Sequence, residues 1–364
     1  MKTQTMTIAI LTVLVACTIP CIFDATDAEA SIMVEDGIGN TIVLDETPDH
    51  IVAIGKGVNA TLIRLGVGDK IVVCDNYSTN ADDPELDLLD QRKSEGKLLA
   101  DGNIYTSGKS GLINNCVYAV DRYGFDKDKD VIIMTGSEGY LQYILDDLRG
   151  FGFRNIAVWY EISSFGELCD YAESISVLST GAVSNEVIQM KTLSDSISDA
   201  LGSTERRDAL CITYSGGEFK VNNVGSLAGS MIIAAGGNAF TIDGSKPSPT
   251  YSTNIPNMFS NGRHSDAVVF VDYQVMNNEE TLSRLLMQLP GSVTIVGLKP
   301  LWNNFDIESM DGVQAMAQSM YPQVFGEYIP ASTSDGDDDS MSYAIAMVIS
   351  VILISVGFMM FTRK

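Results

Sequence analysis

Short runs of β-branched and other apolar residues, spread along most of the chain, constrain its fold more than any other feature. Nearly every position within a run is apolar, which is typical of strands covered on both faces. Helical stretches such as residues 59–65, 139–149 and 226–235 lie between the runs. This alternation predicts an α/β fold with mainly parallel sheets. The runs cover residues 51–54, 70–73, 131–134, 156–159, 209–213, 267–271 and 292–296.

The middle of the chain interrupts this alternation. Residues 165–201 contain no strand-like run and no proline, and Gly181 divides them into two helical pieces. In the second piece, Met190 and Ile197 recur at the spacing of one helical face. We expect a connecting helix over residues 181–203, and an ordinary surface helix of one domain is the alternative.

The length of the chain between its two ends favours two lobes over one. We therefore expect an N-terminal α/β lobe over residues 31–180 and a C-terminal α/β lobe over residues 204–328. Each lobe would be Rossmann-like, with helices on both faces of its sheet.

The C-terminus predicts a membrane anchor. Residues 343–361 carry no charge, and the whole uncharged stretch would be about 33 Å long as a helix, enough to cross a hydrocarbon core. Arg363 and Lys364 follow it and favour the cytoplasmic side, which places the preceding chain outside. Residues 329–342, rich in Ser and Asp, read as a solvated tether.

The N-terminus predicts export. Residues 1–30 combine one early lysine, an apolar run and small residues before Ser31, as in a cleavable signal peptide. The sequence around Cys17 also resembles a lipobox, so lipidation of this cysteine is an alternative. Together the two ends predict a single-pass protein of the cell membrane whose folded part is extracytoplasmic.

Charge and cysteine content exclude several functions. The formal net charge of −24 repels nucleic acid and disfavours a nucleic-acid partner. The mature chain keeps Cys74, Cys116, Cys169 and Cys211, whose spacing fits no zinc site. Export permits disulfides in any of three pairings, although the apolar surroundings of Cys74 and Cys211 favour buried free thiols.

Catalytic and metal chemistry are sparse. The chain has only two histidines, His50 and His264, which we expect to be solvated loop residues. No Gly-x-Ser-x-Gly elbow accompanies them. We expect neither an enzyme, nor a metal site, nor a cofactor.

Several stretches, in the same order along the chain, resemble the substrate-binding proteins of ABC importers for iron–siderophore complexes, haem and cobalamin. The resemblance implies two α/β lobes joined by one long helix, with a metal chelate or corrinoid held in the cleft between them. It also implies limited hinge motion, because a continuous helix resists bending. The stretches are residues 34–44, 48–54, 65–72, 177–181, 234–238 and 317–325.

Ligands of open α/β sheets bind just past the carboxyl ends of the strands, and this rule selects most of the candidate site residues. Tyr105 and Tyr251 are added because they lie in loops that could face the cleft. Their aromatic and polar side chains would suit a bulky, partly apolar chelate. For each of them, a packing or turn role is the alternative. The candidates are Lys56, Asn59, Tyr77, Tyr105, Ser137, Trp159, Tyr160, Tyr214, Tyr251, Tyr273 and Trp302.

One departure concerns the permease. In the family that the chain resembles, each lobe usually presents a surface glutamate to the permease, and these positions fall at Thr61 and Ser230 here. Neither is charged, so standard docking is in doubt, although the tether would keep receptor and permease close. A cell-surface structural or adhesion protein that reuses the fold without transport is the alternative function.

Overall fold

The computed structural model describes residues 31–79, 84–240, 250–251, 255–299, 302 and 305–328. The expected signal peptide, the tether and the membrane helix at Tyr343–Phe361 lie outside these residues. Within the described part, no helix is long and apolar enough to span a membrane.

The N-terminal lobe is built on a four-stranded parallel sheet in the order β4-β3-β5-β6. Every residue of the four strands is buried, which explains why each run is apolar throughout. The strands are β3 (Ile51–Ile54), β4 (Ile71–Cys74), β5 (Val131–Thr135) and β6 (Ile156–Trp159).

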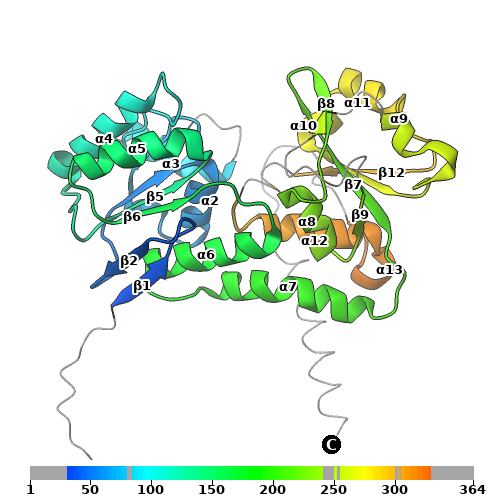
Figure 1. Cartoon of the computed structure of the whole chain (residues 1–364), viewed down its shortest axis with the longest axis horizontal. Helices are drawn as coiled ribbons and strands as arrows, with labels where there is room; N and C mark the ends of the chain where they lie inside the picture. The colour runs from blue at the N-terminus through cyan, green and yellow to red at the C-terminus, as the bar shows by residue number, and fades with distance from the viewer. Residues whose placement is uncertain are drawn as a thin grey trace, which may run out of the picture. The chain divides into compact units, whose positions relative to one another are not determined.

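Helices cover both faces of this sheet (Figure 1). On one face, α4 (Lys109–Tyr123) and α5 (Glu138–Gly150) pack on the strand residues that include Val52 and Ile132. The other face carries the hairpin β1–β2 and several helices. These elements are β1 (Ile32–Glu35), β2 (Thr41–Leu44), α2 (Lys56–Arg64), η1 (Gly68–Lys70), η2 (Pro84–Leu86), α3 (Asp87–Ser94) and α6 (Phe165–Thr180).

The turn of the β1–β2 hairpin is fastened to the edge strand β6. Buried Asp36 accepts hydrogen bonds from the backbone N–H groups of Asn40, at 2.7 Å, and Val158, at 3.0 Å. Strand β6 is at the edge of the sheet, so the second bond gives its Val158 N–H group an acceptor on the side that has no neighbouring strand.

The C-terminal lobe has a mixed sheet in the order β10-β8-β7-β11-β12, with β9 also paired to β7. Strands β7, β11 and β12 are parallel, whereas β8 runs antiparallel to both β7 and β10. The sequence therefore predicted the parallel strands correctly and missed the antiparallel pairing of β8 with β7 and β10. The strands are β7 (Asp208–Ser215), β8 (Glu218–Val221), β9 (Asn238–Ala239), β10 (Thr250–Tyr251), β11 (Val268–Asp272) and β12 (Thr294–Leu298).

This sheet is also covered on both faces. The helices α8 (Leu227–Ala234), α12 (Ser309–Met320) and α13 (Pro322–Phe325) contribute to the core on one face. The other face packs against residues of α9 (Ile255–Met258), α10 (Tyr273–Met276) and α11 (Glu279–Leu286), and the short η3 (Ser260–Gly262) follows α9.

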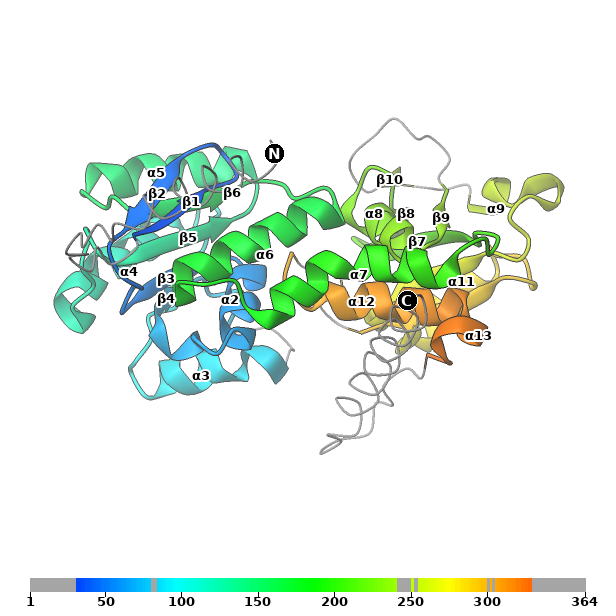
Figure 2. The same ribbon diagram turned by 90° about the horizontal axis from the view of Figure 1, so that it is seen from below.

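The two lobes are connected by α7 (Asn185–Leu201), which packs against α6, α8 and α12 (Figure 2). Gly181, with a φ of 80°, ends α6, and the Ser184 side chain caps α7 by accepting a hydrogen bond from the Val187 N–H. The expected connecting helix is present, and Met190 and Ile197 are on its buried face.

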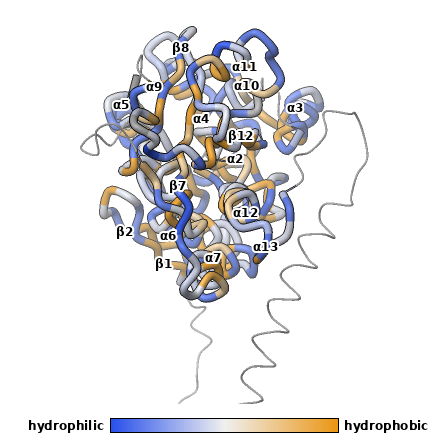
Figure 3. Tube along the Cα trace, turned by 90° about the vertical axis from the view of Figure 1, so that its right-hand side faces the viewer, coloured by the Kyte–Doolittle hydropathy of each residue, from blue (hydrophilic) through white to orange (hydrophobic). Residues whose placement is uncertain are grey.

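One hydrophobic core runs through both lobes. It joins Val58 of α2 and Ala172 of α6 to Met190 of α7 and Met316 of α12. Figure 3 shows hydrophobic segments of α6, α7 and α12 gathered together. A continuous apolar interface of this kind resists independent motion of the lobes.

The four cysteines in the described part of the chain, Cys74, Cys116, Cys169 and Cys211, are buried and free, as the apolar surroundings of Cys74 and Cys211 favoured. Burial raises the pKa of the Cys116 and Cys169 thiols to about 12. Burial also holds the pKa of Cys74 and Cys211 well above the ordinary value.

Candidate ligand-binding site

Three exposed tyrosines meet at the carboxyl edge of the N-terminal sheet, and we call them the tyrosine cluster. Tyr77 follows β4, Tyr105 lies in the loop before α4, and Tyr140 lies in the first turn of α5, which follows β5. The Tyr105 ring packs edge to face against Tyr77 at 5.6 Å and Tyr140 at 4.9 Å between centroids. Their side chains are 48, 42 and 41% exposed, so the rings present an aromatic surface to solvent.

Asp75 holds this surface in place. Its carboxylate accepts hydrogen bonds from the Gly55 N–H at 2.7 Å and the Tyr77 N–H at 3.0 Å. It also accepts one from the Ser78 hydroxyl at 3.0 Å. Because Asp75 is buried, these bonds tie the end of β4 to the start of α2 and fix the backbone that carries Tyr77.

The loop that carries Tyr105 is fixed in the same way. The Asn103 side-chain oxygen accepts a hydrogen bond from the Tyr105 N–H at 2.9 Å, and the Gly102 carbonyl accepts one from the Asn76 N–H at 2.8 Å. The loop therefore runs beside the turn after β4, which explains why Tyr77 and Tyr105 meet.

The structure separates the remaining N-terminal candidates into two groups. Lys56, Ser137 and Tyr160 are at least partly exposed near the ends of their strands, and the Tyr160 hydroxyl bonds to the Gln142 side chain at 2.9 Å. Burial raises the pKa of Tyr160.

Asn59 and Trp159 are instead core residues in this structure. The Asn59 amide donates to the carbonyl oxygens of Ala53, at 3.2 Å, and Gly55, at 3.0 Å. The Trp159 ring packs edge to face on Tyr171 at 5.2 Å. These contacts give Asn59 and Trp159 a packing role, which was the alternative to ligand contact.

Two C-terminal candidates have described side chains. Tyr214 packs on Phe219 at 5.1 Å between ring centroids, and its hydroxyl accepts a hydrogen bond from Arg284 at 2.9 Å. Buried Trp302 donates from its indole nitrogen to Asp272 at 3.3 Å. Burial raises the pKa of Asp272, which ends β11 at the carboxyl edge of the second sheet.

For the last two candidates, only the backbone is described. Tyr251 pairs with Lys220 in the β10–β8 ladder, and Tyr273 is the first residue of α10 after β11.

Sequence reasoning missed Tyr140. Its signal was its place one helical turn beyond the carboxyl end of β5, where the rule that selected Ser137 also applies.

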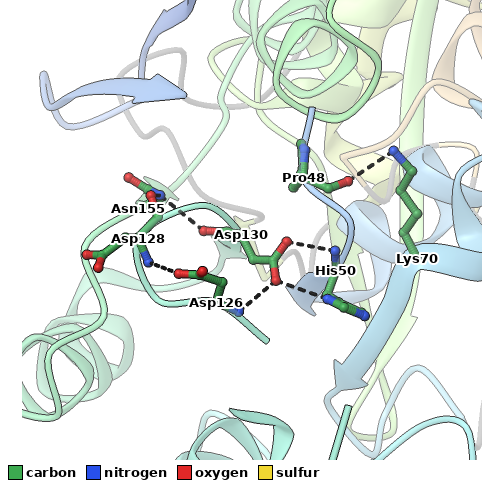
Figure 4. A network of polar contacts seen from close by, with 7 residues as sticks. All are labelled: Pro48, His50, Lys70, Asp126, Asp128, Asp130 and Asn155. Atoms are coloured by element: carbon green, nitrogen blue, oxygen red, sulfur yellow. Dashed lines mark hydrogen bonds and ion pairs between the residues drawn. The ribbon is translucent and has the colours of Figure 1, made fainter. Parts of the chain in front are cut away.

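Both histidines lie in loops, as expected, but each is less than one third exposed and pairs with an aspartate. His50 Nδ1 lies 3.0 Å from Asp130, a buried residue that also accepts the N–H groups of His50 and Asp126 at 2.8 Å (Figure 4). His264 Nδ1 lies 2.6 Å from Asp208 and stacks on Phe240 at 3.8 Å. Each pair joins two parallel strands at their amino ends, away from the candidate site.

The structure also corrects the expectation that Thr61 and Ser230 are surface positions facing a permease. Thr61 is 0% exposed inside α2, and the Ser230 hydroxyl of α8 accepts a hydrogen bond from the Phe165 N–H at 2.9 Å. A fully buried threonine cannot mark a surface docking position, and Ser230 is only partly exposed and already bonded between two helices. The absence of glutamate at these positions therefore says nothing about docking.

No family model and no curated protein matches the chain at the sequence level. Solved structures do match its fold. CeuE of Helicobacter pylori in a nickel–histidine complex aligns with a TM-score of 0.56 and 12% identity, over 81% of this chain and 90% of that one.

Two further structures agree. A periplasmic binding protein of Veillonella parvula aligns with a TM-score of 0.56 and 14% identity, over 83% of this chain and 95% of that one. The vitamin B12 binding protein BtuF of Vibrio cholerae aligns with a TM-score of 0.51 and 16% identity, over 75% and 96%. The chain therefore has the two-lobed fold of the periplasmic substrate-binding proteins.

Proposed function

We propose that this protein is an extracytoplasmic solute-binding receptor that delivers its ligand to an ABC importer. The observation that carries the proposal is the tyrosine cluster, because it places an exposed aromatic surface where ligands bind in open α/β sheets. The fold supports the same function, since proteins of this fold bind solutes. Binding would shift the two lobes toward the arrangement that the permease accepts.

The ligand that suits this surface is bulky and partly aromatic, as haem, a corrinoid or an iron–siderophore chelate would be. Edge-to-face tyrosine rings offer apolar area together with phenolic oxygens that donate and accept hydrogen bonds. Proteins of the same fold include a vitamin B12 binder and haem binders. Their identities with this chain are low, so the ligand class rests on the tyrosines themselves.

Membrane tethering belongs to the same proposal. A signal peptide over residues 1–30 would export the chain, and a helix over residues 343–361 would hold it on the outer face. The tether would replace a search in three dimensions by a high effective concentration near the permease. Exposed acids such as Glu218, the first residue of β8, are candidates for docking.

The test is ligand titration of the folded fragment 31–328 by intrinsic fluorescence, with haem, cobalamin and a ferric siderophore as probes. We expect saturable binding of one probe, and a loss of about tenfold or more in affinity for Tyr105→Ala, which removes the central ring. Tyr118→Ala is the matched control, because Tyr118 is 61% exposed on α4 and belongs to no ring pair of the cluster.

Two outcomes would contradict the proposal. If the folded fragment bound none of the three probes, the ligand class would be wrong, and a surface protein without transport would become the better interpretation. If Tyr105→Ala and Tyr118→Ala bound equally well, ligand binding would lie elsewhere than at the tyrosine cluster.

A further inference from the structure

One cation, Arg64, lies where the N-terminal lobe, the connecting helix and the C-terminal lobe meet. Arg64 ends α2, and α7 and α12 lie side by side next to it (Figure 2). Its carboxylate partners are Glu186 in the first turn of α7, Glu308 just before α12 and Asp311 in the first turn of α12. Arginine is not deprotonated in proteins, and its planar guanidinium offers five N–H donors. One side chain can therefore bind all three parts at once.

The guanidinium forms an ion pair with each of these carboxylates. Its Nη1 donates a hydrogen bond to Asp311 Oδ2 at 3.0 Å and lies 3.8 Å from Glu308 Oε1. Its Nε lies 3.7 Å from Glu186 Oε1. The side chains of Arg64, Glu308 and Asp311 are 22, 17 and 30% exposed, so solvent screens their charges less than at an open surface. Removing the cation would leave partly buried carboxylates unpaired, which is costly.

These ion pairs are the ones that join the two lobes in the described part of the chain. Every other ion pair between described residues lies within one lobe or joins α6 to α7. One neutral hydrogen bond, from the Phe165 N–H to the Ser230 hydroxyl, also crosses between the lobes. A charge-assisted bond is roughly twice as strong as a neutral one and has a preferred direction. The hydrophobic core between the lobes is non-directional, so Arg64 supplies orientation that the core lacks.

The helix that carries Arg64 begins at the candidate ligand site. Its first residue, Lys56, follows Gly55, whose N–H group donates to Asp75 at 2.7 Å. The helix has nine residues and is about 13 Å long, and Val58 anchors it in the core. A shift of Arg64 relative to α12 would therefore be transmitted along α2 to the edge of the sheet that carries the tyrosine cluster.

We propose that Arg64 is a positioning residue whose ion pairs to α7 and α12 hold the tyrosine cluster in one orientation relative to the C-terminal lobe. Loss of this cation leaves the carboxylates of Glu186, Glu308 and Asp311 to repel one another without a counterion. The hydrophobic core keeps the lobes together, but their relative orientation then varies more widely. The proposal concerns the ligand-free protein and does not depend on the proposed function.

The test measures the distance between the lobes in the full-length chain, in detergent and without ligand. Spin labels at Tyr118→Cys on α4 and Met287→Cys after α11 occupy exposed positions in different lobes, and the four described cysteines are buried. Cys17 and Cys21, in the expected signal peptide, are replaced by serine. Double electron–electron resonance then gives the distribution of distances between the two labels.

Arg64→Met removes the charge and keeps most of the apolar volume of the side chain. We expect the population at the native distance to fall at least about twofold, because the unpaired carboxylates disfavour the native arrangement. Asp311→Asn should broaden the distribution less, since Arg64 keeps its other two partners. The double variant Arg64→Met/Asp311→Asn should broaden it no more than Arg64→Met alone, because both changes remove the same interaction.

Arg154→Met is the matched control. Arg154 pairs with Asp128 at 3.1 Å inside the N-terminal lobe, so the same substitution removes an ion pair that does not join the lobes, and the distribution should stay native. An Arg64→Met distribution equal to that of the native protein or of Arg154→Met overturns the proposal. Fully additive effects of Arg64→Met and Asp311→Asn overturn it as well, because Arg64 would then act through packing and not through its ion pair.

A second variant keeps the test open if Arg64→Met folds poorly. Glu186→Gln/Asp311→Asn leaves Arg64 in place and removes its partners on α7 and in α12. We expect the same broadening as for Arg64→Met, by at least about twofold in the native population. A native distance distribution in this folded double variant would overturn the proposal.

Discussion

The carboxylate of Asp75 accepts a hydrogen bond from the backbone N–H of Gly55 at 2.7 Å and thereby joins the ends of two adjacent parallel strands. Gly55 has a φ of 116°, and a Cβ at this position would lie 2.4 Å from the Thr135 hydroxyl. Only glycine suits this turn, so the carboxyl edge of the first lobe is built for close backbone approach.

Asp75→Ala should weaken both the fold and ligand binding. The change leaves the N–H groups of Gly55 and Tyr77 without their acceptor in a buried setting, which costs about 1–3 kcal/mol for each group. We expect a lower free energy of unfolding in urea and weaker binding of the probe that the native fragment binds, since Tyr77 loses its fixed backbone. Asp69→Ala, at an exposed carboxylate in η1, is the control and should change neither. Unchanged binding by a folded Asp75→Ala variant would show that the loop needs no preorganisation.

Thr61 gives a sharper stability test. Its hydroxyl is fully buried and has no hydrogen-bond partner in the described part of the chain. Thr61→Val replaces it by a methyl group of similar size, so we expect stability equal to the native value or up to about 1 kcal/mol higher. Thr61→Glu would bury a charge and should cost at least about 3 kcal/mol.

Urea unfolding of the two Thr61 variants measures the difference. Equal stability of Thr61→Glu and the native protein would mean that this position is on the surface, contrary to the structure. The result would also reopen the question of whether position 61 meets a permease.

Much of the fold could be predicted from the sequence because buried parallel strands must be apolar along their whole length. Every run that the pattern selected overlaps a strand, and β3 and β6 match their runs residue by residue. Strands β9 and β10 have only two residues each, and β8 alternates buried and less buried positions, so pairing with β7 defines all three. Such pairing is a tertiary property that local sequence does not carry.

The site was less predictable for a related reason. The rule of strand ends locates a region of the chain but not the direction of each side chain. Trp159 ends β6, yet its ring packs in the core beside Tyr171, whereas Tyr140, one helical turn past β5, reaches the surface. Similarly, the pairing of His50 with Asp130 joins residues 80 positions apart, which no local pattern reveals.

The two His–Asp pairs should stabilise the fold without affecting the ligand. His50→Ala removes the side-chain bond to Asp130 but leaves the backbone bonds, so we expect a loss of about 1–2 kcal/mol. Asp130→Ala also removes the acceptor for two N–H groups and should cost more. Urea unfolding and ligand titration together check this, with Asp128→Ala at an exposed carboxylate as the control. A large change in ligand affinity for His50→Ala would show that the amino edge of the sheet communicates with the site.

The burial of the four described cysteines predicts that their thiols react only when the protein unfolds. The thiolate is the reactive form, and burial raises the pKa of Cys116 to about 12, so this thiol stays protonated at about pH 8 in the native state. Burial has the same effect on Cys74 and Cys211. In the native fragment 31–328 we expect almost no reaction with a disulfide reagent, and complete reaction of Cys74, Cys116, Cys169 and Cys211 in denaturant. Rapid labelling of the native protein would mean that these helices and strands open on the timescale of the assay. A lack of labelling after unfolding would mean that the thiols are oxidised. Because burial raises the pKa of Cys116 from 9.0 to about 12, the thiol ionises first in the unfolded state, and the native protein should lose stability as the pH rises from about 9 to about 12.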